Sequence, residues 1–169
     1  SANLLTHEGV VEVFENLEDL ANRIDSEDLN VTKDSILLLR NIGPIGAPGM
    51  PEAGLIPIPK KLARQGVKDM VRISDGRMSG TAAGTIILHV CPEAAAGGTL
   101  GIVESGDIIK LDVANRSLEL KLSDEEINKR KKIKKINTDS RRRGYNRIFH
   151  ESVLQADKGA DFDFLRPLK

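Results

Sequence analysis

The segment at positions 42–59, IGPIGAPGMPEAGLIPIP, limits what this chain can fold into more than any other part of it. It carries five prolines and four glycines in 18 residues, so it cannot form a regular helix or strand. A loop of this length inside a compact domain is usually functional or disordered. The apolar runs before and after it, at 34–41 and 68–74, are typical of buried strands. We therefore predict strands joined by a long, irregular connection.

A second glycine-rich segment, SDGRMSGTAAG at 74–84, precedes another apolar run, TIILHV at 85–90. It is either a plain turn or a loop that brings backbone N–H groups and one side chain to a ligand. Ser79 precedes Gly80, so its hydroxyl has little steric cover. A serine is a poor base unless a metal, a set of N–H dipoles or a general base stabilises its alkoxide. Spacing alone leaves both interpretations open and slightly favours the turn.

The remaining pattern mixes strands with few helices. Alternating apolar residues at 10–14 predict a strand, and helical spacing at 17–24 predicts an amphipathic helix. Further expectations are a helix at 59–66, one helical turn at 91–98, three β segments in a meander at 100–122, helices at 124–135 and 144–156, and an extended tail. Ser123 and Glu126 form a capping box for the helix at 124–135. The pattern predicts an α+β or barrel-like domain with helices packed outside, and no composition break divides it.

Charge and cysteine content exclude several classes of protein. The 25 basic and 25 acidic residues cancel, so no global field draws the molecule to nucleic acid or membrane. The nine Lys and Arg residues at 129–143 lack stacking aromatics other than Tyr145, which favours a solvated helix face over a nucleic-acid surface. A single cysteine excludes an internal disulfide or a cluster held by this chain alone. Without a membrane-length apolar run or a signal peptide, we expect an intracellular, cytoplasmic protein.

Two further side chains are candidates for chemistry. Cys91 follows His89 by two positions on an expected strand, which would place a thiol and a base on one face, but a small buried cysteine is the favoured interpretation. Glu52 is the only acid in the 42–59 loop. A rigid loop can hold one carboxylate in place, and Mg²⁺ is satisfied by few protein ligands. One ligand does not make a metal site.

Four motifs together resemble the C-terminal domain of the dihydroxy-acid and phosphogluconate dehydratase family in order and spacing. They are GAPGMPE (46–52), SDGRMSGTAAG (74–84), HVCPEAAAGG (89–98) and GDIIKLDVANRSLEL (106–120). The stretch at 55–75 and the ending VLQADKGADFDFL are more similar to the sugar acid (aldonic acid) branch than to the branched-chain amino acid branch. The resemblance implies that 1–169 is one swivelling, mixed β-barrel domain with flanking helices, excised from a longer dehydratase whose N-terminal, cluster-binding domain is absent.

The resemblance also implies an activity and a site. The full-length protein would be an iron–sulfur, Mg²⁺-dependent hydro-lyase that converts a 2,3-dihydroxy sugar acid to a 2-keto-3-deoxy acid. Ser79 matches the serine base that takes the C2 proton, Glu52 matches a Mg²⁺ ligand, and Gly80 and Thr81 match the loop around the substrate. Arg77 and Asp75 are candidates to orient this loop through an ion pair or to bind the acid. The cluster ligands and most Mg²⁺ ligands would lie in the missing N-terminal domain.

The expected partners are that N-terminal domain, a small sugar acid and further copies in a homo-oligomer, with no nucleic acid and no membrane. Residues 1–169 alone are expected to be inactive. Two alternatives stay open: a dihydroxy-acid dehydratase of branched-chain amino acid synthesis, and a non-catalytic domain that binds a partner through its glycine-rich loops.

Overall fold

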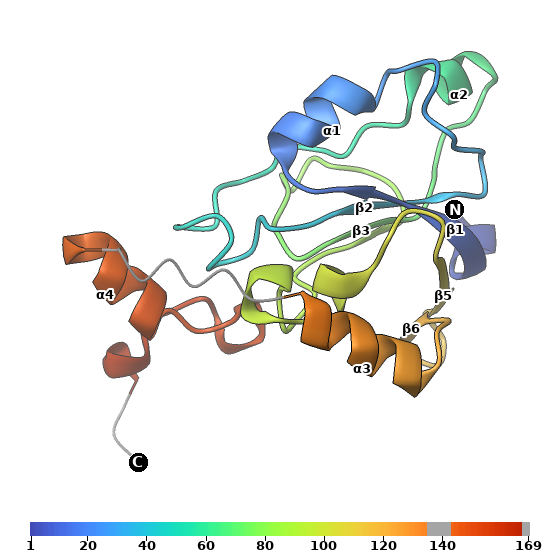
Figure 1. Ribbon diagram of the computed structural model, residues 1–169. Helices are drawn as coiled ribbons and strands as arrows, with labels where there is room; N and C mark the ends of the chain where they lie inside the picture. The colour runs from blue at the N-terminus through green and yellow to red at the C-terminus, as the bar shows by residue number, and fades with distance from the viewer. Residues whose placement is uncertain (135–142, 167–169) are drawn as a thin grey trace.

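The computed structural model describes residues 1–134 and 143–166, which are built around a six-stranded sheet of order β4-β3-β2-β1-β5-β6 (Figure 1). The strands are β1 (Thr6–Phe14), β2 (Ile36–Leu39), β3 (Arg72–Ser74), β4 (Ile86–Ile87), β5 (Ile108–Asp112) and β6 (Ser117–Leu120). The α-helices are α1 (Leu17–Arg23), α2 (Lys60–Arg64), α3 (Asp124–Ile133) and α4 (Gly144–Ser152). The mixture of sheet and separate helices confirms the predicted α+β class.

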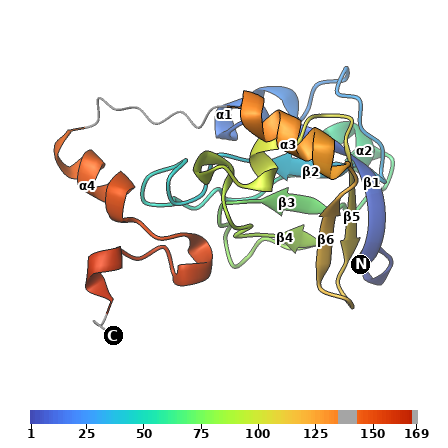
Figure 2. The ribbon, with the colours of Figure 1, turned by 60° about the horizontal axis from the view of Figure 1, so that its bottom comes forward.

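The sheet is mixed and strongly curled. Strands β1 to β4 are mutually parallel, whereas β5 pairs antiparallel with β1 and β6 pairs antiparallel with β5. In Figure 2, β5 and β6 run across the direction of β3 and β4, so the sheet forms half of a barrel. Among the described residues, β4 and β6 are the two edges of this half-barrel.

The central strand β2 divides its side chains between two hydrophobic clusters. Leu37 and Leu39 pack in one cluster with side chains from α1 and α2, and Ile36 and Leu38 pack in the other with side chains from β5 and the segment around Leu100. All four side chains of β2 are fully buried. Because both faces of the sheet are covered, this strand is apolar throughout rather than alternating.

The helices begin where the sequence predicts. The Asn16 side chain accepts from the Asp19 amide at the start of α1, and the Ser123 hydroxyl accepts from the Glu126 amide (3.2 Å) at the start of α3. Most basic residues of α3 are exposed, as expected of a solvated face. Arg130 is the exception, because its guanidinium pairs with Asp107 at 2.6 Å. The part of the basic run at 135–142 lies outside the described residues.

Two predicted strands are wrong in part. The run at 100–103 is a short helix, η3 (Thr99–Ile102), whose carbonyls together with that of Val103 point at the buried Arg40 guanidinium. The strand predicted at 85–90 ends as β4 at Ile87, because His89 has φ +57 and leaves the extended conformation. The remaining short helices are η1 (Ala2–Leu4), η2 (Ala94–Ala96), η4 (Ala156–Lys158) and η5 (Asp163–Leu165).

The tail is also more ordered than predicted. Val153 and Phe162 form an antiparallel bridge across η4, and the Leu154 amide donates to the Asp161 carbonyl. Within the described ranges 1–134 and 143–166, none of the helices has the length and apolar character required to cross a bilayer.

Candidate functional site

The carboxyl ends of the parallel strands meet at one edge of the sheet. The chain leaves β2 into the proline-rich loop, β3 into the glycine-rich loop that starts at Asp75, and β4 into the segment around Cys91. In Figure 2 these loops gather beyond the strand ends, on the side that faces α4. In open sheets of parallel strands, ligands bind outside the carboxyl ends. This edge therefore holds the motifs on which the sequence prediction depends.

The two loops are hydrogen-bonded to each other along their backbones. The Ala53 amide donates to the Arg77 carbonyl (2.9 Å), and the Ser79 amide donates to the Gly54 carbonyl (3.2 Å). These bonds join the two residues that follow Glu52 to Arg77 and Ser79, although the two segments are about 25 positions apart. The structure thus holds the segment that follows Glu52 against the segment that carries Ser79.

Arg77 strengthens this pairing through its side chain. Its Nε donates to the Met50 carbonyl at 2.7 Å, and its Nη1 lies 3.9 Å from a Glu52 carboxylate oxygen. Both charged side chains are about half exposed, so the ion pair is a weak, solvent-screened contact. Arg77 fits the predicted orienting role, since it fixes the backbone two residues before Glu52.

The Ser79 hydroxyl lies in a turn with the Thr81 amide and the Thr81 hydroxyl beside it. Its Oγ is 2.9 Å from the Thr81 hydroxyl and accepts from the Thr81 amide at 3.3 Å. Ser79 is half-buried, whereas Gly80 and Thr81 are exposed. A Cβ placed on Gly80 would meet nothing within 4 Å, so space outside the loop is open to a ligand. The amide, and the Thr81 hydroxyl when it donates, are the groups that would favour an alkoxide on Ser79.

Asp75 has a different role from the one predicted. It is fully buried, and its carboxylate accepts from the backbone amides of Asn41 (3.1 Å), Ile42 (3.1 Å) and Ala94 (3.0 Å). Burial raises the pKa of Asp75 above the ordinary range, against the lowering effect of these amide donors. A buried carboxylate whose oxygens are occupied by backbone donors cannot bind the substrate acid. Asp75 instead joins the three loops at this edge.

Glu93 is a second buried carboxylate of this kind, and sequence reasoning missed it. It accepts from the amides of Ile45 and Gly46, each at 2.9 Å, and from the Gln155 side-chain amide at 2.8 Å. The Glu93 backbone amide in turn donates to the Gln155 side-chain oxygen Oε1 at 2.8 Å. A Cβ on Gly43 would lie 2.6 Å from a Glu93 oxygen, so a glycine is required there. The only sequence signal was an acid within an otherwise apolar and small-residue motif.

The donors at this edge fit Mg²⁺ in part and do not fit an iron–sulfur cluster. Glu52 is exposed and offers hard oxygen donors, which suit one position of a Mg²⁺ ion completed by other ligands. The described residues hold no group of three or more His, Cys, Asp or Glu side chains placed to bind a metal. Cys91, the one cysteine, donates to the His89 carbonyl at 3.1 Å. This bond goes to the backbone and not to the His89 ring, so a thiol–imidazole pair is not formed.

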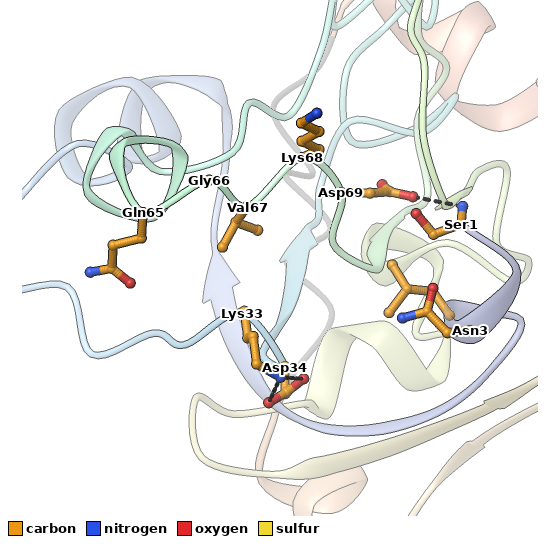
Figure 3. Close-up of a pocket in the computed structure, with 10 residues that line it drawn as sticks. Ser1, Asn3, Lys33, Asp34, Gln65, Gly66, Val67, Lys68 and Asp69 are labelled. Carbon is orange, nitrogen blue, oxygen red and sulfur yellow. Dashed lines mark hydrogen bonds and ion pairs between the residues drawn. The ribbon is translucent and has the colours of Figure 1, made fainter.

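A hollow of about 380 Å³ lies at the opposite, amino edge of the parallel strands (Figure 3). It is lined by Ser1, Asn3, Leu4, Lys33, Asp34 and residues 65–69. Burial acts to raise the pKa of Asp69, but hydrogen bonds from the Thr85 amide and hydroxyl act to lower it. Its carboxylate is also paired with Arg72 at 3.0 Å. The second acid here, Asp34, pairs with Lys33 at 2.8 Å. Both acids in this hollow therefore already have protein partners, and none of the predicted site residues lies here.

Comparison with known proteins gives a consistent result along the chain. Residues 1–160 match the family described as dihydroxy-acid/6-phosphogluconate dehydratase C-terminal. The chain is 48% identical to 6-deoxy-6-sulfo-D-gluconate dehydratase of Pseudomonas putida, over 96% of this chain and 28% of that protein. It is 46% identical to L-arabinonate dehydratase of Rhizobium leguminosarum bv. trifolii (strain WSM2304), over 98% of this chain and 29% of that protein.

A dihydroxy-acid dehydratase of Clostridium botulinum (strain Alaska E43 / Type E3) is 40% identical, over 93% of this chain and 28% of that protein. The chain thus spans only 28–29% of the length of these relatives.

Proposed function

Because this chain belongs to the dihydroxy-acid/6-phosphogluconate dehydratase C-terminal family, we propose that it is the C-terminal domain of a longer hydro-lyase that acts on a sugar acid. The family predicted from the motifs is confirmed, and so is the greater similarity to sugar acid dehydratases, at 48% and 46% identity against 40%. In this proposal residues 1–169 form a single domain that swivels against an N-terminal domain. That domain would carry the iron–sulfur cluster.

The observation that supports a site on this chain is the backbone pairing of the two loops. The Ser79 amide to Gly54 carbonyl bond (3.2 Å) and the Ala53 amide to Arg77 carbonyl bond (2.9 Å) hold the serine segment against the carboxylate segment. A hydroxyl that serves as a base and a carboxylate that serves as a metal ligand must act on the same small substrate. Neither could do so from separate parts of the surface.

Ser79 is the proposed base. As an alkoxide, its Oγ takes the C2 proton, and the C2–H electron pair forms the C2=C3 bond while the C3–O bond breaks. The C3 hydroxyl departs as hydroxide and is protonated to water, and the resulting enol takes a proton at C3 to give the 2-keto-3-deoxy acid. The Thr81 amide and hydroxyl, at 3.3 and 2.9 Å from this oxygen, stabilise the negative charge that a basic serine carries. The open side of Gly80 leaves room for the substrate carbon to approach Ser79.

Glu52 is the proposed contribution of this chain to a Mg²⁺ site. When bound there, Mg²⁺ would supply positive charge that makes the C2 proton more acidic. Arg77 keeps the loop in place through the Met50 carbonyl at 2.7 Å. The single cysteine does not fit a cluster, so no step of the reaction is assigned to iron and sulfur on this chain.

The test is turnover of a substrate panel by the full-length protein. The panel contains L-arabinonate, 6-deoxy-6-sulfo-D-gluconate and a branched 2,3-dihydroxy acid, which also decides between the sugar acid assignment and the dihydroxy-acid dehydratase alternative. Ser79→Ala is expected to lower kcat by roughly 10²–10⁴-fold. Ser117→Ala, at an exposed position on β6, is the matched control and should keep normal turnover. Normal turnover by Ser79→Ala would remove the serine from the mechanism.

A further inference from the structure

The aromatic residues of this chain are concentrated in its last described segment. The sequence has four Phe and one Tyr, and all of them except Phe14 lie between positions 145 and 164. Phe149 contacts Phe162 edge-on with ring centroids 5.6 Å apart, and Phe162 stacks on Phe164 at 5.2 Å. With their neighbours these rings form an aromatic patch made of Tyr145, Ile148, Phe149, Phe162, Phe164 and Leu165.

Much of this aromatic patch is exposed. Tyr145 is 72% exposed, Ile148 52%, and Phe164 and Leu165 61% each. On α4, Tyr145, Ile148 and Phe149 have the i, i+3, i+4 spacing of one helix face. The opposite face carries the Arg147–Glu151 ion pair at 2.7 Å. No residue of α4 is buried, and the helix stands apart from the sheet in both views (Figures 1 and 2).

Exposure of this kind is unusual for a surface that faces only water. Monomeric proteins rarely expose contiguous apolar patches, and those that exist mark interaction sites. Aromatic side chains are also enriched among the residues that dominate interface energies. An amphipathic helix with no buried residue gains little stability from its own fold. We therefore expect another part of the protein or a partner to cover the aromatic patch.

The segment that carries the aromatic patch is attached at the edge that holds Ser79 and Glu52. Gln155, three residues after α4, exchanges two hydrogen bonds of 2.8 Å with Glu93, one to its carboxylate and one from its amide. Glu93 also holds the proline-rich loop through the Ile45 and Gly46 amides. A protein domain that packs against the carboxyl edge of the sheet would therefore contact the aromatic patch as well.

We infer that the aromatic patch docks on the part of the polypeptide that lies outside residues 1–169. This inference rests on the proposed function, under which a longer protein supplies the remaining ligands at the carboxyl edge. Two observations favour this occupant over a second copy of the chain. The relatives are more than three times as long as the matched region, which covers 28–29% of them. The described residues also hold no group of three or more His, Cys, Asp or Glu side chains placed to bind a metal, so the proposed site needs ligands from another part of the protein that covers the same edge.

The test is photocross-linking in the full-length protein with benzoylphenylalanine at position 148 or 147. Ile148 lies on the patch face of α4, and Arg147 lies on the opposite face of the same helix. Irradiation of the position-148 variant should give a cross-linked species of monomer mass. Its peptides should join residues 143–166 to sequence outside 1–169. The position-147 variant should give little product.

Three results would overturn the inference. They are a cross-linked species of dimer mass, a cross-link back to residues 1–134, or equal yields from the two positions. Turnover of Ser79→Ala is measured separately on the same protein. Normal turnover by Ser79→Ala together with the expected cross-link would refute only the serine assignment. Loss of turnover together with an unexpected cross-link would refute only the docking of the aromatic patch.

Discussion

Replacing Asp75 tests whether a buried carboxylate holds the site loops together. In Asp75→Ala the backbone amides of Asn41, Ile42 and Ala94, now 3.0–3.1 Å from a carboxylate oxygen, lose their acceptor inside the protein. Each buried N–H left unsatisfied costs about 1–3 kcal/mol. The variant no longer has a carboxylate to bury, and the free energy saved in this way offsets part of the cost of the three unsatisfied amides. We therefore expect the free energy of unfolding to fall by about 3 kcal/mol.

Two further variants make this loss diagnostic. Asp75→Asn keeps one oxygen, which can still accept from Asn41 and Ala94, and should cost about 1 kcal/mol. Ser74 is the buried residue directly before Asp75. Ser74→Ala removes only the hydroxyl that accepts from the Gly76 amide at 3.0 Å, and it should also cost about 1 kcal/mol. Urea unfolding followed by circular dichroism at neutral pH measures all three. If Asp75→Ala cost no more than Ser74→Ala, the three-loop junction would have no energetic role.

Three other perturbations follow from the same contacts. Because burial raises the pKa of Asp75, the protonation-linked part of its contribution to stability is complete below the ordinary Asp pKa of about 4 and is lost as pH rises through the raised value, whereas the hydrogen bonds from the three amides remain. The unfolding free energy of the wild type minus that of Asp75→Asn should therefore fall with rising pH in a urea series, and a rise would contradict the assignment. Gln155→Glu places a second carboxylate at the 2.8 Å contact with Glu93. Hydrogen exchange at the Ile45 and Gly46 amides should therefore become faster than in Gln155→Ala. Equal exchange rates in the two variants would exclude repulsion between the two carboxylates as the cause. In Gly84→Ala the new Cβ would lie 1.9 Å from the Arg72 guanidinium, whereas at Gly66, also at positive φ, it would meet nothing within 4 Å. Calorimetry should therefore show that Gly84→Ala costs about 2 kcal/mol more stability than Gly66→Ala. Equal costs would mean that the loss of stability comes from backbone strain alone and not from the contact with Arg72.

Local sequence patterns predicted the elements whose cause is local. The change from alternating to helical spacing after Phe14 located β1 and α1, and the Ser123 capping box located the start of α3. The patterns failed where a contact with a residue distant in the sequence determines the local structure. Thr99–Ile102 is apolar enough for a strand, but its carbonyls are drawn to the guanidinium of Arg40, about 60 positions earlier. No local rule anticipates that contact.

The same limit applies to the candidate site. Its two loops could be predicted, since their glycine and proline content excludes regular structure and each follows an apolar run typical of a strand. The residues that hold them together could not. Glu93 acts on amides 47 and 48 positions earlier and on a side chain 62 positions later. Asp75 was a candidate for substrate binding until its burial and its amide partners were known.

The most direct test of the account measures sugar acid dehydration by the full-length protein as a function of Mg²⁺ concentration. It compares the wild type with Glu52→Gln and Ser79→Ala. If the two paired loops act as one site, Glu52→Gln raises the half-saturating Mg²⁺ concentration and recovers turnover at high Mg²⁺. Ser79→Ala should then remain inactive at every concentration. An unchanged Mg²⁺ dependence in Glu52→Gln, or normal turnover by Ser79→Ala at saturating Mg²⁺, would contradict the account.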